Sequence, residues 1–414
     1  MSHHRSASFL VFLLSTTLFL SLLPGFSLPA VLTLVQRDWG MGPGQAGVVI
    51  AAFQAGYILA AIIALPLTDR YDARWIIAGG AAVCTAGHLA FAAMAHDPLT
   101  GTILRALAGA GLGGVYMPGL RLASMVPSMK GRAVGLYVSS YLFGTAFSFA
   151  VTGALAALVP WQSAYLAVSV VSGLALVAGL WLIRSPMPEG ITAVPPRPAR
   201  AEDRVREQFS FRARLPVILV IGAYIAHMWE LYGLRSWLAP FMVAAAGGET
   251  AGAAARGALL ASLSVVLSAT STIIAGWLSD RLGRSLTAAV ILTASAACSF
   301  VFGWLLSAPF WLIAVIGVVY SLTVAADSPI FSTSLTELVP SEKLGHVMAW
   351  QTFLGYGAAT LSPAAFGFIL ESFPGAQGWG LAFGLLGAGA VLGPGLMLIL
   401  RRFPESARLC SGKR

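Results

Sequence analysis

The chain has 414 residues, of which 57% are hydrophobic and only 10% are charged, and its mean hydropathy is +0.82. Soluble domains carry about 25% charged residues, so this composition excludes a water-soluble globular protein of this length. Glycine contributes 45 residues, an excess that is typical of helices packing closely in lipid.

Apolar segments long enough to cross a bilayer recur along the chain. A hydrocarbon core of about 30 Å needs roughly 20 apolar residues per helix. The first such run could also be read as a signal peptide, but it is longer than a normal signal-peptide core, and we expect it to be a span. The sequence therefore predicts an all-α integral membrane protein with twelve spans, at residues 9–33, 45–67, 75–95, 100–126, 133–158, 162–183, 215–243, 257–279, 286–306, 309–333, 346–371 and 379–400.

The basic residues predict the orientation of these spans. Of the 25 Lys and Arg residues, 20 fall on loops and termini of one side, and only Arg37 and Arg256 fall on the other. Because cytoplasmic loops carry the excess of Lys and Arg, we expect both termini in the cytoplasm of a cell (inner) membrane. The net charge of +9 is thus a topology signal, and we expect lipid rather than nucleic acid as the partner.

One long polar segment, rich in Pro and Arg, divides the spans into six and six. We interpret it as a cytoplasmic linker that is either a solvated tether or a contact to anionic headgroups. The predicted domains are an N-terminal bundle (1–184), the linker (185–214), a C-terminal bundle (215–402) and a cytoplasmic tail (403–414).

The two halves repeat one another at an offset of 211 residues. The matching positions are Pro29 with Pro240, Leu67 with Leu278, Asp69 with Asp280, Arg70 with Arg281, Pro118 with Pro329 and Gly144 with Gly355. Parallel repeats of this kind are how transporters with a binding site between two halves are built.

The sharpest repeated element follows the second span of each half. It reads Gly276-Trp-Leu-Ser-Asp280-Arg281-Leu-Gly283-Arg284 in the second half, and the first half keeps Asp69, Arg70 and Arg74. A glycine allows close helix approach, an aspartate can neutralise the N-terminal end of a neighbouring helix, and the arginines can pair across the halves. A plain positive-inside loop would not explain aspartate before arginine at the same place twice.

These residues carry a family resemblance over essentially the whole chain. The second loop matches G-x-x-x-D-R-x-G-R in full, whereas the first departs at Leu65, Asp72 and Ala73, and the fourth span matches R-x-x-x-G-x-G at Arg105, Gly109 and Gly111. The chain resembles the transporters of the major facilitator superfamily, with a further likeness to cyanate and nitrate/nitrite porters around Tyr116 and His227. The resemblance implies two six-helix bundles that work by alternating access. It also implies a cavity lined by the first and fourth helix of each half, and a cytoplasmic gate made by Asp69, Arg70, Arg74, Gly276, Asp280, Arg281, Gly283 and Arg284.

Ionisable residues inside spans are functional candidates because a charge in the bilayer is costly. His227 and Glu230 lie three residues apart on the seventh span, and Asp327 aligns with Tyr116 in the repeat. We predict that these three titratable residues, His227, Glu230 and Asp327, couple transport to protons. Structural hydrogen bonding is the alternative for each.

Three arginines inside spans favour a small anion or zwitterion as substrate. The predicted substrate-binding residues are Arg105, Tyr116, Arg121, Tyr232, Arg235 and Tyr320. Arg121 lies nearer the cytoplasmic end and could instead snorkel or pair there, and packing is the alternative for the tyrosines. His88 is expected to be a packing residue.

The predicted function is proton-coupled secondary transport by a monomer. The alternative is proton-driven efflux of a hydrophobic compound, and a neutral sugar is less favoured because the cavity helices contain few Asn and Gln. Metalloprotease and serine-hydrolase motifs and a phosphate-binding loop are missing from the sequence, so we expect neither an enzyme nor an ATP-driven pump. The cysteines Cys84, Cys298 and Cys410 are far apart in sequence, so we expect no disulfide framework, metal or other cofactor.

Overall fold

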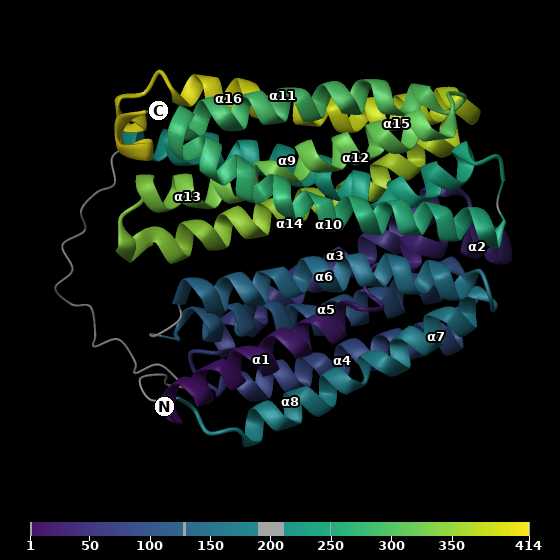
Figure 1. Ribbon diagram of the computed structural model, residues 1–414, viewed down its shortest axis with the longest axis horizontal. Coiled ribbons are helices and arrows are strands. Elements are labelled where there is room, and N and C mark those ends of the chain that lie inside the picture. The colour runs from purple at the N-terminus through teal and green to yellow at the C-terminus, as the bar shows by residue number, and fades with distance from the viewer. Residues whose placement is uncertain (1, 127–129, 189–210, 249, 414) are drawn as a thin grey trace. The chain divides into compact units, whose positions relative to one another are not determined.

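The computed structural model describes residues 2–126, 130–188, 211–248 and 250–413. These residues are helical with connecting turns, and no strand occurs among them. The helices of the first half are α1 (Ser2–Leu22), α2 (Ser27–Trp39), α3 (Pro43–Leu67), α4 (Ala73–Met94), α5 (Pro98–Ser124), α6 (Lys130–Ala156), α7 (Trp161–Ser172) and α8 (Leu174–Arg184) (Figure 1).

The second half continues with one further run of helices. These are α9 (Phe211–Ala245), α10 (Ala251–Leu282), α11 (Arg284–Phe302), η2 (Gly303–Leu305), α12 (Phe310–Ala326), α13 (Ser328–Leu338), α14 (Ser341–Ser372), α15 (Gly375–Ala390), α16 (Leu392–Leu400) and the 3₁₀ segment η3 (Pro404–Gly412).

Within the described residues, twelve helical stretches are long and apolar enough to span a membrane, which confirms the predicted spans. Two of the larger boundary differences have simple causes. The first span runs to Trp39 rather than 33, because the polar Arg37 and Asp38 continue the helix until Gly40, which has a φ of +60°. The tenth extends to Leu338 because the apolar face of α13 remains buried.

The helices form two compact units. The first comprises Met1–Met41, Val48–Glu202 and Glu249–Ser262, and the second comprises Gly42–Gly47, Asp203–Gly248 and Leu263–Arg414. The middle of the predicted linker, residues 189–210, lies outside the described residues.

In the N-terminal unit, glycines allow α5 to pack closely against its neighbours. A Cβ on Gly109 would collide with the carbonyl oxygen of Phe53 on α3, and one on Gly111 would collide with the backbone of Cys84 on α4. The glycines of the fourth-span motif therefore allow α5 to pack closely against both α3 and α4. At its N-terminus, Asp97 accepts hydrogen bonds from the backbone of Leu99 and Thr100, and the bonds from Thr100 lower the pKa of this exposed carboxyl.

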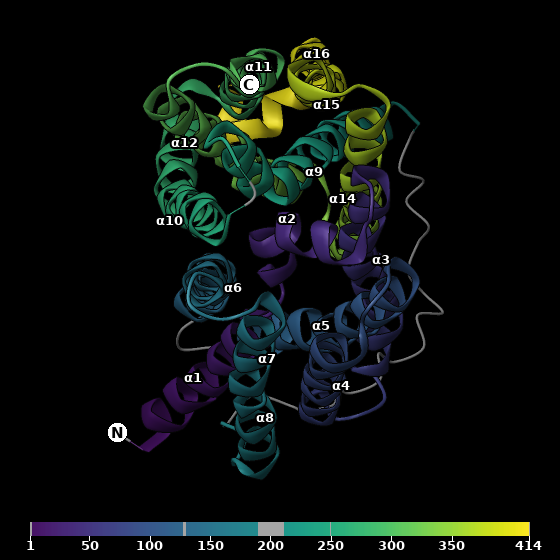
Figure 2. The same ribbon diagram turned by 90° about the vertical axis from the view of Figure 1, so that its right-hand side faces the viewer.

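In the C-terminal unit, α9 packs along α14 and α16, and α11 packs along α15 and α16 (Figure 2). Its aromatic core is formed by Trp237, Phe241, Phe302, Phe366 and Phe383. Within the predicted tail, Ser406 and Leu409 of η3 are buried.

Candidate transport and gating sites

The first span breaks between α1 and α2, and polar side chains satisfy the backbone groups that the break releases. The backbone N–H of Phe26 donates to Ser148 Oγ at 3.0 Å, and Ser27 Oγ lies 2.6 Å from Thr152 Oγ1. Without such partners, backbone groups inside a bilayer would cost several kcal/mol each, on the order of the penalty for burying an amide unpaired.

Arg105 contributes to the same break. Its guanidinium donates to the carbonyl of Gly25 at 3.0 Å and to Tyr165 Oη at 3.3 Å, and it stacks 4.4 Å from the centroid of the Phe53 ring. The side chain is only 2% exposed. Arg105, predicted to bind substrate, is placed here inside the N-terminal unit as the hydrogen-bond partner of a broken helix.

His88 joins this network through Tyr165, whose hydroxyl lies 2.9 Å from His88 Nδ1. Sequence analysis missed Tyr165, since a tyrosine in the sixth span carries no local signal of a buried partner. The predicted packing role of His88 thus includes a hydrogen bond.

Tyr116 lies in a cluster of tyrosines rather than beside a charge. It is half-buried and stacks on Tyr137 at 6.0 Å, and its ring centroid is 5.3 Å from that of Tyr141. Its backbone carbonyl accepts a hydrogen bond from Tyr137 Oη at 3.1 Å. The cluster offers flat aromatic surfaces and phenolic hydroxyls, which suit contact with a solute.

His227 pairs with Asp327 and not with Glu230, its neighbour on the same span. His227 Nδ1 lies 2.8 Å from Asp327 Oδ1, without the alignment of a hydrogen bond, and its Nε2 lies 2.9 Å from Ser328 Oγ. Both His227 and Asp327 are 1% exposed. Residues three apart on a helix point about 60° away from each other, and here the two side chains meet different neighbours.

Glu230 is fully buried and faces the hydroxyls of Ser295 and Tyr320. Neither carboxyl oxygen makes an aligned hydrogen bond within the described chain. Tyr320, predicted to bind substrate, donates instead to Ser299 Oγ at 2.8 Å and is itself buried.

Arg235 is half-buried and makes no hydrogen bond or ion pair with any residue that the structure describes. Its guanidinium lies 5.9 Å from the centroid of the Tyr232 ring, and Tyr232 Oη lies 3.4 Å from Tyr356 Oη. Because α9 continues without interruption through Gly233, Arg235 and Glu230 point in different directions, about 140° apart.

The residues of the predicted N-terminal gate contact partners within their own unit. Asp69 Oδ1 lies 2.7 Å from a guanidinium nitrogen of Arg121, which also bonds Thr68. Arg121, predicted to bind substrate, is thus paired with the loop after α3, which its long side chain reaches. Arg74 is paired with Asp72 and bonds the carbonyl of Ser185, and Arg70 is exposed.

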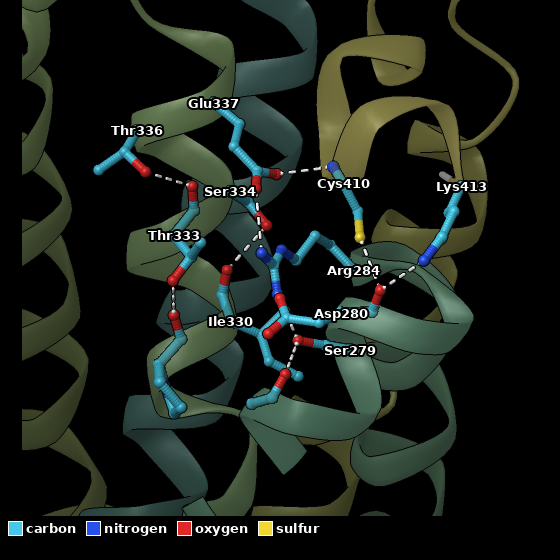
Figure 3. Close-up of polar contacts among 12 residues, drawn as sticks. Ser279, Asp280, Arg284, Ile330, Thr333, Ser334, Thr336, Glu337, Cys410 and Lys413 are labelled. Carbon is cyan, nitrogen blue, oxygen red and sulfur yellow. Dashed lines mark hydrogen bonds and ion pairs between the residues drawn. The ribbon is translucent and has the colours of Figure 1, made fainter. Parts of the chain in front are cut away.

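The C-terminal gate is built around Arg284 (Figure 3). Its guanidinium lies 2.5 Å from Asp280 Oδ1 and 3.0 Å from Glu337 Oε1, and it donates to Ser279 Oγ at 2.6 Å. We call Asp280, Arg284 and Glu337 the C-terminal latch. The arginines were predicted to pair across the halves. In these contacts each aspartate is instead paired with an arginine of its own unit.

The remaining gate residues have local roles. Arg281 stacks on Trp277 at 3.8 Å, and Gly283, with a φ of +97°, makes the turn into α11. Gly276 was predicted to allow close helix approach, but a Cβ there would meet no atom within 4 Å. Ser328 and Glu337 were missed, although a carboxylate at the end of the tenth span was a usable signal for Glu337.

Comparison with solved structures shows the fold. The chain aligns with a bacterial homolog of the human lysosomal transporter Spinster (TM-score 0.76, 16% identity, covering 96% of this chain and 97% of that chain). It aligns with a D-xylose-proton symporter at a TM-score of 0.75 and 16% identity, covering 96% and 99% of the two chains. A peptide transporter POT in complex with sulfate gives 0.75 at 17% identity, covering 96% and 95%.

A curated relative is the uncharacterized transporter YgaY of Escherichia coli O157:H7, 27% identical over 185 residues. This match covers 43% of the chain and 45% of the relative, so it spans about half the length of either protein. The likeness to cyanate and nitrate/nitrite porters stays a prediction, because these matches reach only the level of the superfamily.

The sequence model described as Major Facilitator Superfamily matches residues 8–352 and 231–410, which together include nearly the whole chain. The twelve spans of the chain, its repeated loops and its whole-chain structural matches agree with that assignment. The chain is a multi-pass membrane transporter that belongs to the major facilitator superfamily.

Proposed function

We propose that this chain is a secondary active transporter that works by alternating access and couples protons to a small anionic or zwitterionic solute. The observation that carries the proposal is the composition of α9. This one helix holds a buried carboxyl, Glu230, surrounded by neutral hydroxyls, and a half-buried guanidinium, Arg235, with no ion-pair partner in the described chain.

Glu230 is suited to carry a proton because an ionised carboxylate without strong hydrogen bonds is unstable in an apolar interior. It is therefore neutral while enclosed, and it releases its proton when water or substrate reaches it.

The His227–Asp327 pair is suited to a second role. Ser328 Oγ can donate to a neutral imidazole nitrogen or accept from a protonated one, so its 2.9 Å contact with His227 persists in either state. Ser328 is partly exposed whereas His227 and Asp327 are buried. We infer that protons exchange with this pair through the Ser328 hydroxyl.

Arg235 is suited to bind the anionic group of the solute. A guanidinium presents several N–H donors in one plane and binds carboxylates and similar anions in a bidentate manner. The Tyr232 ring centroid lies 5.9 Å from it, and Tyr356 packs against Tyr232. In this proposal the two tyrosines supply the apolar wall of the site.

The test is proton movement in liposomes that contain the purified protein and a pH-sensitive dye. We expect one or more of cyanate, nitrate, nitrite, formate or short carboxylates to move protons with the wild-type protein. Glu230→Gln should lower this proton flux at least about tenfold, since amide and carboxyl differ by only the titrating group. Arg235→Gln should raise the KM for the anion by about tenfold or more, the loss of one charge-assisted bond.

Asp97→Asn is the matched control, because it also neutralises a carboxyl but lies at the exposed start of α5, where asparagine caps equally well. It should transport like the wild type. If none of the anions moves protons, and hydrophobic compounds release protons under an imposed gradient, proton-driven efflux would replace this proposal.

A further inference from the structure

The C-terminal segment Pro404–Lys413, which we call the strap, is fastened to the C-terminal latch (Figure 3). The backbone N–H of Cys410 donates to Glu337 Oε2 at 3.0 Å, while Glu337 Oε1 accepts from Arg284 at 3.0 Å. The two oxygens of one carboxylate thus hold the strap and the latch arginine together.

The strap also contacts the other side of the latch. Lys413 Nζ donates to the carbonyl oxygen of Asp280 at 3.0 Å, and Cys410 Sγ donates to the same oxygen at 3.1 Å. The strap therefore bridges the end of α10 and the end of α13, the two elements whose charged residues form the latch.

One apolar side chain anchors the strap. Leu409 is fully buried, in a cluster with Leu335, Leu338, Met397 and Leu400. Its neighbours Ala407 and Arg408 are exposed. Ser406 is buried as well, but its hydroxyl bonds the carbonyls of Arg401 and Phe403. Leu409 is thus the apolar anchor of the strap, and a polar side chain of similar size at this position would weaken it.

The strap is held in an unfavourable backbone conformation. Cys410 and Ser411 have φ values of +47° and +54°, in the left-handed region that residues other than glycine seldom occupy. Such a conformation persists only where surrounding contacts hold it. Releasing the contacts would relax the backbone, so the strap is poised to lift.

We propose that the strap holds the C-terminal latch in its paired arrangement and must lift before Arg284 can separate from Asp280 and Glu337. Glu337 is the shared group, so movement of either partner loosens the other. This device acts within the C-terminal unit and does not depend on which solute or ion is transported.

The test measures distances within that unit by electron paramagnetic resonance, in a chain in which Cys84 and Cys298 are replaced by alanine and Cys410 by serine, because serine keeps a donor toward the Asp280 carbonyl. A spin-label pair at Leu282 and Thr336, both exposed, reports the latch. A pair at Ala407 and Thr336 reports the strap. We expect Leu409→Gln to shift both distance distributions to longer values, and a chain ending at Phe403 to shift the latch pair in the same way.

Arg408→Gln is the matched control, because it changes an exposed strap residue next to Leu409 and should leave both distributions unchanged. If Leu409→Gln or truncation moves the strap while the latch pair keeps its distance, the strap does not hold the latch. If Leu409→Gln leaves the strap pair in place, Leu409 is not its anchor. Either result overturns the proposal, and neither bears on proton coupling.

Discussion

At the scale of single residues, Tyr165 joins the buried polar groups of the N-terminal unit. Its hydroxyl is contacted by both Arg105 and His88, and Arg105 forms no ion pair with a carboxylate in the described part of the chain. A buried cation that depends on neutral acceptors needs every one of them, because a lost bond exposes the full cost of desolvation.

We therefore expect Tyr165→Phe to lower the free energy of unfolding by about 1–3 kcal/mol, the cost of leaving a buried polar group unpaired. Thermal unfolding of the purified protein in detergent measures the effect as a fall in Tm. Tyr71→Phe removes a hydroxyl from an exposed ring and should leave Tm unchanged. Equal Tm values for the two variants would contradict the network's role.

At the scale of helices, the two halves pack their first and fifth spans in the same way. A Cβ on Gly144 of α6 would lie 2.9 Å from Leu22 Cβ of α1, and one on Gly355 of α14 would lie 3.1 Å from Met228 Cγ of α9 and collide with the Tyr224 ring. These glycines are equivalent in the repeat, so the repeat is present in packing as well as in sequence.

Gly355→Ala is expected to lower the free energy of unfolding by about 1–3 kcal/mol, because an extra methyl group overfills a packed interface. Gly357→Ala, two residues along α14, should be neutral or stabilising, since a Cβ there meets nothing within 4 Å and alanine favours helix. Comparing the two Tm values separates packing from helix propensity, and a neutral Gly355→Ala would refute the close contact.

The breaks in the helices do not follow the repeat. The first span breaks at Pro24-Gly25, whereas the equivalent positions in α9 are Arg235 and Ser236 and the helix continues. The tenth span breaks at Asp327, whereas its equivalent, Tyr116, lies inside the unbroken α5. Arg235 and Asp327, two of the residues in the proposed function, thus stand where the halves differ.

At the scale of the whole molecule, the latches are predicted to control transport rate and not stability. The Asp280 side chain is 63% exposed, and the more buried Arg284 keeps Glu337 and Ser279 as partners when Asp280 is removed. Loss of this one ion pair should therefore cost only about 0–1 kcal/mol. Asp280→Ala should therefore leave membrane insertion and Tm unchanged and reduce the initial rate of transport in liposomes. A wild-type rate would contradict the latch, and a large fall in Tm would show a structural role instead.

The orientation in the membrane is a further prediction at this scale. The excess of Lys and Arg on one side predicts that a fluorescent protein fused after residue 414 folds in the cytoplasm and fluoresces. Alkaline phosphatase fused after residue 245, at the end of the seventh span, should be active because it lies outside. The reverse pattern for this pair of fusions would show that the orientation is opposite to the predicted one.

The class of the molecule follows from the sequence, because hydropathy, loop charge and repeated Asp-Arg loops are local properties that the bilayer converts directly into spans and sides. The sequence also identifies the ionisable residues that lie inside spans. Their partners are established by the tertiary fold. His227 pairs with Asp327 from a span about a hundred residues away, Arg121 reaches Asp69, and Arg105 bonds the broken first span. The contact between the strap and Glu337 likewise has no signal in the sequence. Which side chains meet depends on helix rotation and on the position of each break, and these are set by packing between segments far apart in the chain.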